Sequence, residues 1–206
     1  MHHTRLHDFN SEKQFSDELK QFAKLTSNKS KGFRAPTFSL NSSTSWVIDS
    51  LVENNYTYDS SIVPAKSSMY GHPNAPERPY KISSNSIENP DTNGNLIEYP
   101  LLVTKFLGKK IPAGGGFYLR TLPMKVIKNA ITNYEKKELP ATFYIHSWEL
   151  TPELMPRIKL SKKDSFITYH NIEKAYEKMD EILGEFEFCL LYTSPSPRDA
   201  TLSRKP

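Results

Sequence analysis

The chain has 206 residues, which suits one domain with a substantial core, and its 37% hydrophobic, 12% aromatic and 24% charged residues are typical of globular proteins and exclude disordered or fibrous classes. The net charge is +4, but the lysines are scattered among acidic residues without interleaved aromatics, which argues against a nucleic-acid partner. The single cysteine, Cys189, excludes an internal disulfide and a thiolate zinc site, and no apolar run approaches the ~18 residues that cross a bilayer.

The N-terminal half alternates helix-like and strand-like segments. Residues 11–24 predict a helix with apolar side chains on one face. A short strand is predicted at 32–34, a helix at 43–55 and a strand at 56–59. Residues 64–95 are rich in Pro, Ser, Asn and Gly, and we expect a long loop there.

The C-terminal half continues the alternation. Residues 96–104 predict a strand, 124–136 a helix, 141–146 a buried strand and 172–183 an amphipathic helix. Strands that alternate with helices are typical of a parallel α/β sheet or barrel.

The last segment of the chain differs in kind from the rest. Residues 189–206 contain Pro and Ser without periodicity, and they resemble translated sequencing-library adapter. We therefore expect one domain over residues 1–188 and an artefactual, disordered tail over 189–206.

A histidine pair opens the chain. His3 and His7 are four residues apart, so on a helical turn both imidazoles can bind one ion, and zinc accepts this ligand readily. Histidines near a terminus are also commonly exposed or tag-like. Spacing alone leaves both interpretations open.

Three further polar residues follow predicted strands. Arg34 lies where parallel α/β folds collect functional groups, although a surface arginine at a turn is an alternative. His146, close to Trp148, suits general acid catalysis or a structural role. Asp59 fits a carboxylate that orients a histidine or a turn residue. The glycines at 114–116 lack the spacing of a dinucleotide loop and indicate a close backbone approach.

Taken in chain order, four motifs resemble those of the polysaccharide deacetylase family, also called the NodB-homology domain or carbohydrate esterase family 4. They are HTRLH at 3–7, RAP at 34–36, YDSS at 58–61 and YIH at 144–146. The surrounding sequence is similar to the exopolysaccharide-associated deacetylases with a C-terminal extension, and the similar phrases are GFRAPTFS, YDSSIVP, IEYP, GGGFY and FYIHSWEL. The resemblance covers about residues 3–188.

This resemblance implies a deformed (β/α) barrel of the NodB type with a zinc ion at the strand ends. It assigns His3 and His7 as zinc ligands beside one Asp, and Arg34 as the residue that holds an Asp base. His146 matches the general acid that protonates the departing amine, and Asp59 fits, less completely, the carboxylate that tunes this histidine. The implied activity is zinc-dependent removal of N-acetyl groups from N-acetylhexosamine units of a polysaccharide.

One family motif has no counterpart here. The Asp base and the third zinc ligand belong to a motif that precedes the histidine pair, but only two residues precede His3. We therefore expect a barrel that lacks its first strands, and an inactive fragment of a parent enzyme that binds zinc poorly.

Two alternative functions stay open at this point. One is a small amide or ureide hydrolase of the same fold, and the other is a non-catalytic glycan-binding module. A role in exopolysaccharide synthesis would place the parent protein at the bacterial cell envelope or on the cytoplasmic side of exopolysaccharide assembly.

Overall fold

The structure is a computed structural model that describes residues 4–27, 29–67 and 70–193. It belongs to the mixed α/β class, as predicted. Within these ranges no helix combines the length and the apolar character that a membrane span requires.

The chain divides into two compact units. Unit 1 consists of residues 1–100 with 190–206, and unit 2 consists of residues 101–189. Compact units need not coincide with domains, so the single domain predicted over residues 1–188 stays a prediction. The artefactual tail predicted over 189–206 also stays a prediction, and most of it lies outside the described residues.

Unit 1 is built around a four-stranded sheet with the order β1-β2-β4-β3. Strands β1, β2 and β4 are parallel, whereas β3 runs antiparallel to β4. The helices, 3₁₀ turns and strands of this unit are η1 (Leu6–Asp8), α1 (Glu12–Leu25), β1 (Gly32–Phe33), η2 (Pro36–Phe38), η3 (Ser42–Thr44), α2 (Trp46–Glu53), β2 (Tyr58–Asp59), β3 (Tyr80–Ile82), β4 (Leu96–Glu98) and η6 (Leu191–Thr193).

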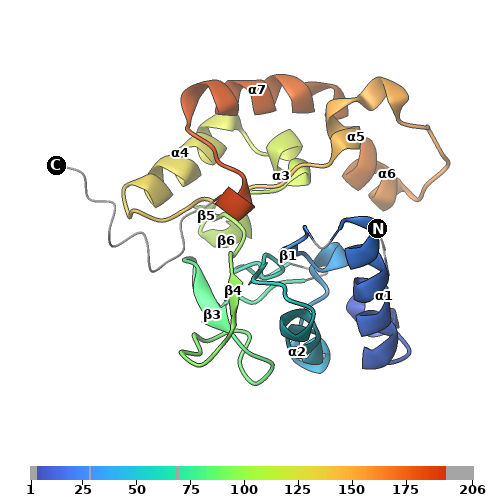
Figure 1. The fold of residues 1–206 in the computed structure, drawn as a ribbon. Coiled ribbons are helices and arrows are strands. Elements are labelled where there is room, and N and C mark those ends of the chain that lie inside the picture. Colours follow the sequence, from blue (N-terminus) through green and yellow to red (C-terminus); the bar gives the residue numbers. More distant parts are fainter. Residues whose placement is uncertain (1–3, 28, 68–69, 194–206) are drawn as a thin grey trace. The chain divides into compact units, whose positions relative to one another are not determined.

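Helices α1 and α2 form the helical layer of unit 1 and lie next to each other (Figure 1). The predicted first helix is confirmed: Ser11 caps it, because its Oγ accepts a hydrogen bond from the Gln14 N–H at 3.1 Å. Both helices bury apolar side chains in one core with the sheet, and this core contains Phe15, Leu19, Val47, Ile48, Leu51, Tyr80, Ile82 and Leu96.

The segment 64–95, predicted as a loop, is packed into unit 1. It contains β3, and His72 and Tyr80 within it are buried. His72 Nε2 donates to the carbonyl of Leu40 at 2.9 Å, while its Nδ1 lies 2.8 Å from Glu88 Oε1. Specific buried contacts therefore order a segment whose composition is typical of a loop.

The single strand predicted over 96–104 is wrong, because the structure has two strands there, β4 and β5 (Val103–Phe106). Pro100 lies between them and has no N–H for a ladder hydrogen bond. The boundary between the two units falls directly after this proline.

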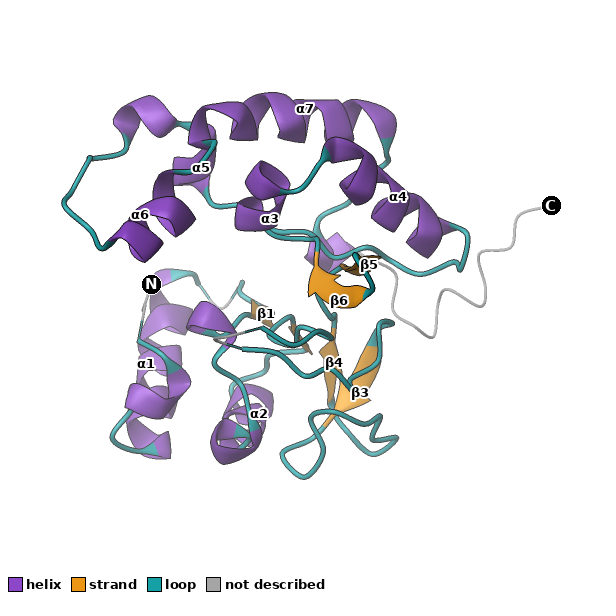
Figure 2. Ribbon diagram, turned by 180° about the vertical axis from the view of Figure 1, so that it is seen from behind, coloured by secondary structure: helices purple, strands orange, loops and turns teal. Residues whose placement is uncertain are grey.

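Unit 2 combines a β-hairpin with a group of helices (Figure 2). Strands β5 and β6 pair antiparallel around Leu107 and Gly108, whose φ angles of 49° and 76° are those of a tight hairpin turn. Its elements are β5, β6 (Lys109–Pro112), α3 (Gly116–Thr121), α4 (Met124–Glu135), α5 (Ser147–Leu150), η4 (Pro152–Leu154), α6 (Lys162–Tyr169), η5 (Ile172–Lys174) and α7 (Ala175–Glu185).

The predictions for unit 2 hold in part. The helices predicted at 124–136 and 172–183 are confirmed as α4 and as η5 with α7, and their apolar faces share one core with Leu102 and Leu119. The continuous strand predicted at 141–146 is wrong: Thr142 and Tyr144 form only isolated parallel bridges.

The described residues contain one four-stranded sheet and one two-stranded hairpin, and no closed barrel among them. A deformed barrel is compatible with this arrangement and stays a prediction.

Candidate functional site

The carboxyl ends of three parallel strands in unit 1 bring polar residues to one edge of the sheet. Phe33, Asp59 and Glu98 are aligned across β1, β2 and β4. Arg34 follows β1 directly. Since functional groups of parallel sheets gather at this edge, these residues form the candidate site in unit 1.

Arg34 is held by the turn that follows β2. Its Nε donates to the Ser60 carbonyl at 2.8 Å and its Nη2 donates to Ser60 Oγ at 2.7 Å, while Ser60 Oγ in turn donates to the Tyr99 carbonyl at 2.8 Å. The loop after Arg34 contains Thr37 and Phe38, both with left-handed φ angles of 54° and 53°. Strained backbone of this kind persists only where surrounding contacts impose it.

Asp59 and Glu98 form a fully buried carboxyl pair. Ser61 Oγ donates to Asp59 Oδ1 at 2.7 Å, and the Ala35 N–H donates to Ser61 Oγ at 2.8 Å. The Glu98 carboxyl accepts from the N–H groups of Ile62 at 3.0 Å and Ser61 at 3.4 Å. The pair therefore joins the turn after β2 to the loop after β1.

Burial sets the protonation of this pair. It raises the pKa of Asp59 to about 6, against the opposing effects of hydrogen bonds from Ser61 and Glu98 and of the Arg34 charge. Burial and the adjacent Asp59 also raise the pKa of Glu98 well above its ordinary value. Buried Asp59 Oδ2 finds no N–H or hydroxyl donor in the described part of the chain, but a protonated Glu98 carboxyl supplies one. We interpret the two side chains as sharing a proton.

Of the predicted metal ligands, His3 lies outside the described residues. His7 belongs to η1, its side chain is 45% exposed, and its Nε2 lies 3.5 Å from Asp8 Oδ1. Arg5 donates to Asp8 at 2.9 Å, and this hydrogen bond lowers the pKa of the Asp8 carboxyl. Within the described ranges, no three His, Cys, Asp or Glu side chains are grouped closely enough to hold a metal ion. Of the two predicted histidine ligands, the described residues contain His7, and the zinc site stays a prediction.

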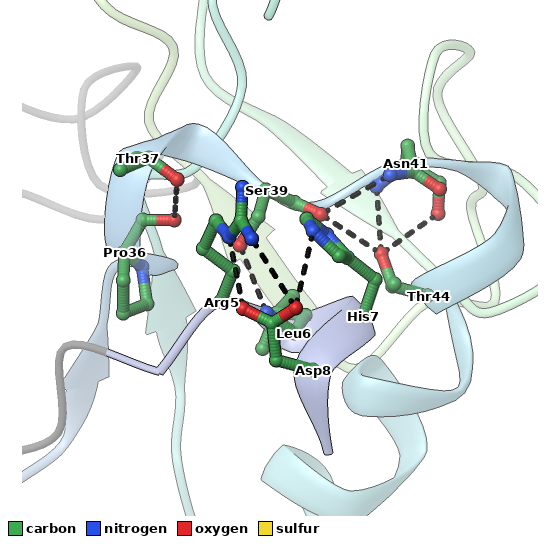
Figure 3. A network of polar contacts seen from close by, with 9 residues as sticks. All are labelled: Arg5, Leu6, His7, Asp8, Pro36, Thr37, Ser39, Asn41 and Thr44. Atoms are coloured by element: carbon green, nitrogen blue, oxygen red, sulfur yellow. Dashed lines mark hydrogen bonds and ion pairs between the residues drawn. The ribbon is translucent and has the colours of Figure 1, made fainter. Parts of the chain in front are cut away.

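The segment with His7 is attached to the loop after Arg34 (Figure 3). Leu6 is buried, and its N–H donates to Ser39 Oγ at 3.0 Å. The Ser39 carbonyl accepts from Asn41 and Thr44 at 3.2 and 3.1 Å. The loop therefore contacts the histidine segment on one side and the Asp59–Glu98 region on the other.

His146 lies in unit 2, at the N-terminus of α5. It is exposed, and its ring centroid is 5.4 Å from that of Tyr144 and 5.5 Å from that of Trp148. Its backbone N–H donates to Glu149 Oε2 at 3.1 Å. The imidazole is thus accessible to solvent and flanked by two aromatic side chains.

The structure brings Arg34 and Asp59 together in unit 1. The predicted contact between Asp59 and His146 stays a prediction, since the two residues belong to different units and Asp59 contacts Ser61 and Glu98 in its own. Sequence reasoning assigned no role to Glu98. An acidic residue inside the apolar run before Pro100 was the available signal.

The sequence of a known protein family matches most of the chain. Residues 60–194 match the family described as "Domain of unknown function (DUF3473)". The chain belongs to the DUF3473 family. The DUF3473 region includes Glu98 and His146, whereas His7, Arg34 and Asp59 precede it. No curated protein and no solved structure matches the chain.

Proposed function

We propose that this chain is part of a metal-dependent hydrolase that removes N-acetyl groups from N-acetylhexosamine units of a polysaccharide, on a deformed barrel of the NodB type. The observation that carries the proposal is that Arg34 donates two hydrogen bonds to Ser60 at the carboxyl ends of the parallel strands. Both residues belong to motifs that resemble those of polysaccharide deacetylases. The DUF3473 family is associated with polysaccharide deacetylase-like proteins, which also supports it.

The reaction breaks the amide C–N bond of the acetamide. Water adds its hydroxyl to the acyl carbon, and the nitrogen leaves with a proton, so the products are acetate and a free amine. An amide nitrogen is a poor leaving group until it is protonated, and a positioned imidazolium can supply that proton. In the proposal His146, exposed between Tyr144 and Trp148, donates it from a ring nitrogen.

In the proposal, Arg34 and the histidine pair serve to activate the water. The resemblance assigns zinc to His3, His7 and an Asp, and a bound zinc ion would polarise the acyl oxygen and lower the pKa of water. Arg34, fixed by Ser60, would hold the carboxylate base through its charge.

The rings around His146 favour a glycan over a small ureide. Tyr144 and Trp148 are partly exposed, and both rings lie near the imidazole. Exposed aromatic faces offer a large apolar surface for a sugar ring at low entropic cost. A compact ureide would contact only a small part of it.

The test uses the chain preceded by a strand that ends in Asp-Asp, so that the base and third ligand are present. We expect acetate release from N-acetylglucosamine oligomers, its loss on chelation and its recovery with zinc, and a 100-fold or larger decrease in kcat for His146→Gln, since general acids contribute roughly 10²–10⁴-fold.

The other outcomes separate the alternatives. Turnover of ureides without acetate release from the oligomers would identify a small-amide hydrolase. Oligomer binding without turnover, in a folded protein that holds stoichiometric zinc, would identify a glycan-binding module. If that protein shows neither turnover nor oligomer binding, the proposed activity is excluded.

A further inference from the structure

A buried ion pair contacts the backbone of His146 in unit 2. Arg120 at the end of α3 and Glu149 in α5 are 1% and 2% exposed, and Arg120 Nε lies 2.9 Å from Glu149 Oε1. A buried pair of charges is no better for stability than apolar side chains of similar volume. Stability alone therefore does not account for this pair.

The second oxygen of Glu149 binds the backbone of His146. Oε2 accepts the His146 N–H at 3.1 Å, and the Glu149 N–H donates to the His146 carbonyl at 3.0 Å. The first of these bonds is the half of a capping box in which a Glu at the third helical position binds the N–H of the N-cap residue. The space for the carboxylate exists because residue 116 is glycine: a Cβ on Gly116 would lie 1.9 Å from Glu149 Oε2.

Arg120 fixes the same region by two further routes. Its Nη1 donates to the His170 carbonyl at 2.7 Å and its Nη2 donates to the Ile167 carbonyl at 2.9 Å. Its guanidinium also lies 5.9 Å from the Trp148 ring, and that ring is the one beside the His146 imidazole. Arg120 therefore connects the His146 backbone and its aromatic neighbour to α6 and the residue that follows it.

Helix α5 needs such support, because it has only four residues, Ser147–Leu150, and a helix of that length is not stable by itself. We propose that Glu149 and Arg120 are positioning residues for the His146 imidazole, acting through the His146 N–H and the Trp148 ring. The catalytic part of this inference rests on the proposed function. The positioning role explains why the sequence segments GGGFY and FYIHSWEL contain Gly116 and Glu149.

The first test is spectroscopic and needs no activity. In the 206-residue chain, the imidazole Cε1–Hε1 signal of His146 is assigned with His146→Gln and is followed by NMR. Rings of Tyr144 and Trp148 near the imidazole displace this signal from its position in the unfolded chain. We expect Glu149→Gln, which keeps the shape of the side chain but cannot accept both hydrogen bonds, to return the signal at least halfway to that position.

Lys178→Met is the matched control. Lys178 Nζ donates to the carbonyls of Leu119 and Leu122 at 2.9 Å each, so its loss perturbs the end of α3 but removes none of the hydrogen bonds between Glu149 and His146. Its His146 signal should stay at the wild-type position. Where Glu149→Gln does not fold, the double variant Arg120→Met/Glu149→Gln, which removes both charges, is measured in its place with the same expected shift.

A wild-type His146 signal in the folded test variant, or an equal shift in Lys178→Met, would overturn the proposal. In the active protein we further expect Glu149→Gln to lower kcat at least tenfold with little change in KM. If the wild-type protein shows no deacetylase activity while the variant still displaces the His146 signal, the proposed function fails and the positioning role stands.

Discussion

The buried carboxyl pair of unit 1 predicts an unusual dependence of stability on pH, which Glu98→Gln should reduce because it removes one of the two carboxyls. The glutamine side chain can still accept the Ile62 N–H, for which Glu98 now provides an oxygen at 3.0 Å. Its amide can donate to Asp59 Oδ2 at every pH, whereas Glu98 can do so only while protonated. The expected loss of contacts is limited to the longer 3.4 Å bond from Ser61.

The magnitude follows from the shift of Asp59, whose pKa burial raises from 3.8 to about 6. A raised pKa means that the folded protein holds the proton more tightly than the unfolded one. This stabilising contribution is therefore fully present below about pH 4 and is lost as the pH rises through about 6. At about 1.4 kcal/mol per pH unit the loss reaches about 3 kcal/mol, and Glu98, whose pKa is also raised, adds to it in the same direction.

The assay is urea unfolding at pH 4 to 8, followed by the fluorescence of Trp46, which packs in the core of unit 1. Trp148→Phe serves as the background, so that only unit 1 is reported. We expect the wild-type free energy of unfolding to fall by about 3 kcal/mol or more between pH 4 and pH 7. That of Glu98→Gln, which keeps the buried Asp59 but lacks the second carboxyl, should fall by less. Glu53→Gln, an exposed site on α2, controls for the loss of one charge. Parallel pH profiles for wild type and Glu98→Gln would refute the shared proton.

Three further predictions concern other parts of the chain. Arg34→Lys should cost about 1 kcal/mol in urea unfolding and at least tenfold in kcat of the active protein, because an ammonium cannot reproduce the forked contact with Ser60; an unchanged kcat would contradict the assigned role. Gly115→Ala should destabilise unit 2 by about 1–3 kcal/mol, since the added Cβ would lie 2.6 Å from the Tyr144 ring. Gly184→Ala, whose Cβ would meet no atom within 4 Å, should stabilise α7 by up to about 1 kcal/mol. Melting temperatures of both variants equal to that of wild type would argue against both predictions. His7→Ala should weaken zinc binding of the active protein at least tenfold by calorimetry, and an unaltered affinity would remove His7 from the ligand set.

Amphipathic helices were the most predictable part of the fold. Helix α1 has a capping serine and buried Phe15 and Leu19 on one face, so local chemistry and periodicity agree. Strands were less predictable because their pairing depends on distant residues. The run at 96–104 is mostly apolar, yet Pro100 separates two strands that belong to different units.

The candidate site was predictable only where a residue follows a strand directly. Arg34 was found in this way, and its contact with Ser60 joins residues 26 positions apart. Glu98 was missed because its role depends on the register that aligns it with Asp59, and no local pattern encodes that register. Glu149 was missed in a similar way, since its partner Arg120 is 29 positions away.

The packed segment 64–95 also bears on how related sequences should be aligned. Its composition suggests a region in which insertions and deletions accumulate freely. The contacts of His72 with Leu40 and Glu88, and the burial of Tyr80, restrict length changes to its exposed turns, such as 73–74 and 89–90. Gaps in homologous sequences should therefore cluster at those turns, and a gap that removes the histidine should be accompanied by a change in the loop that follows Arg34.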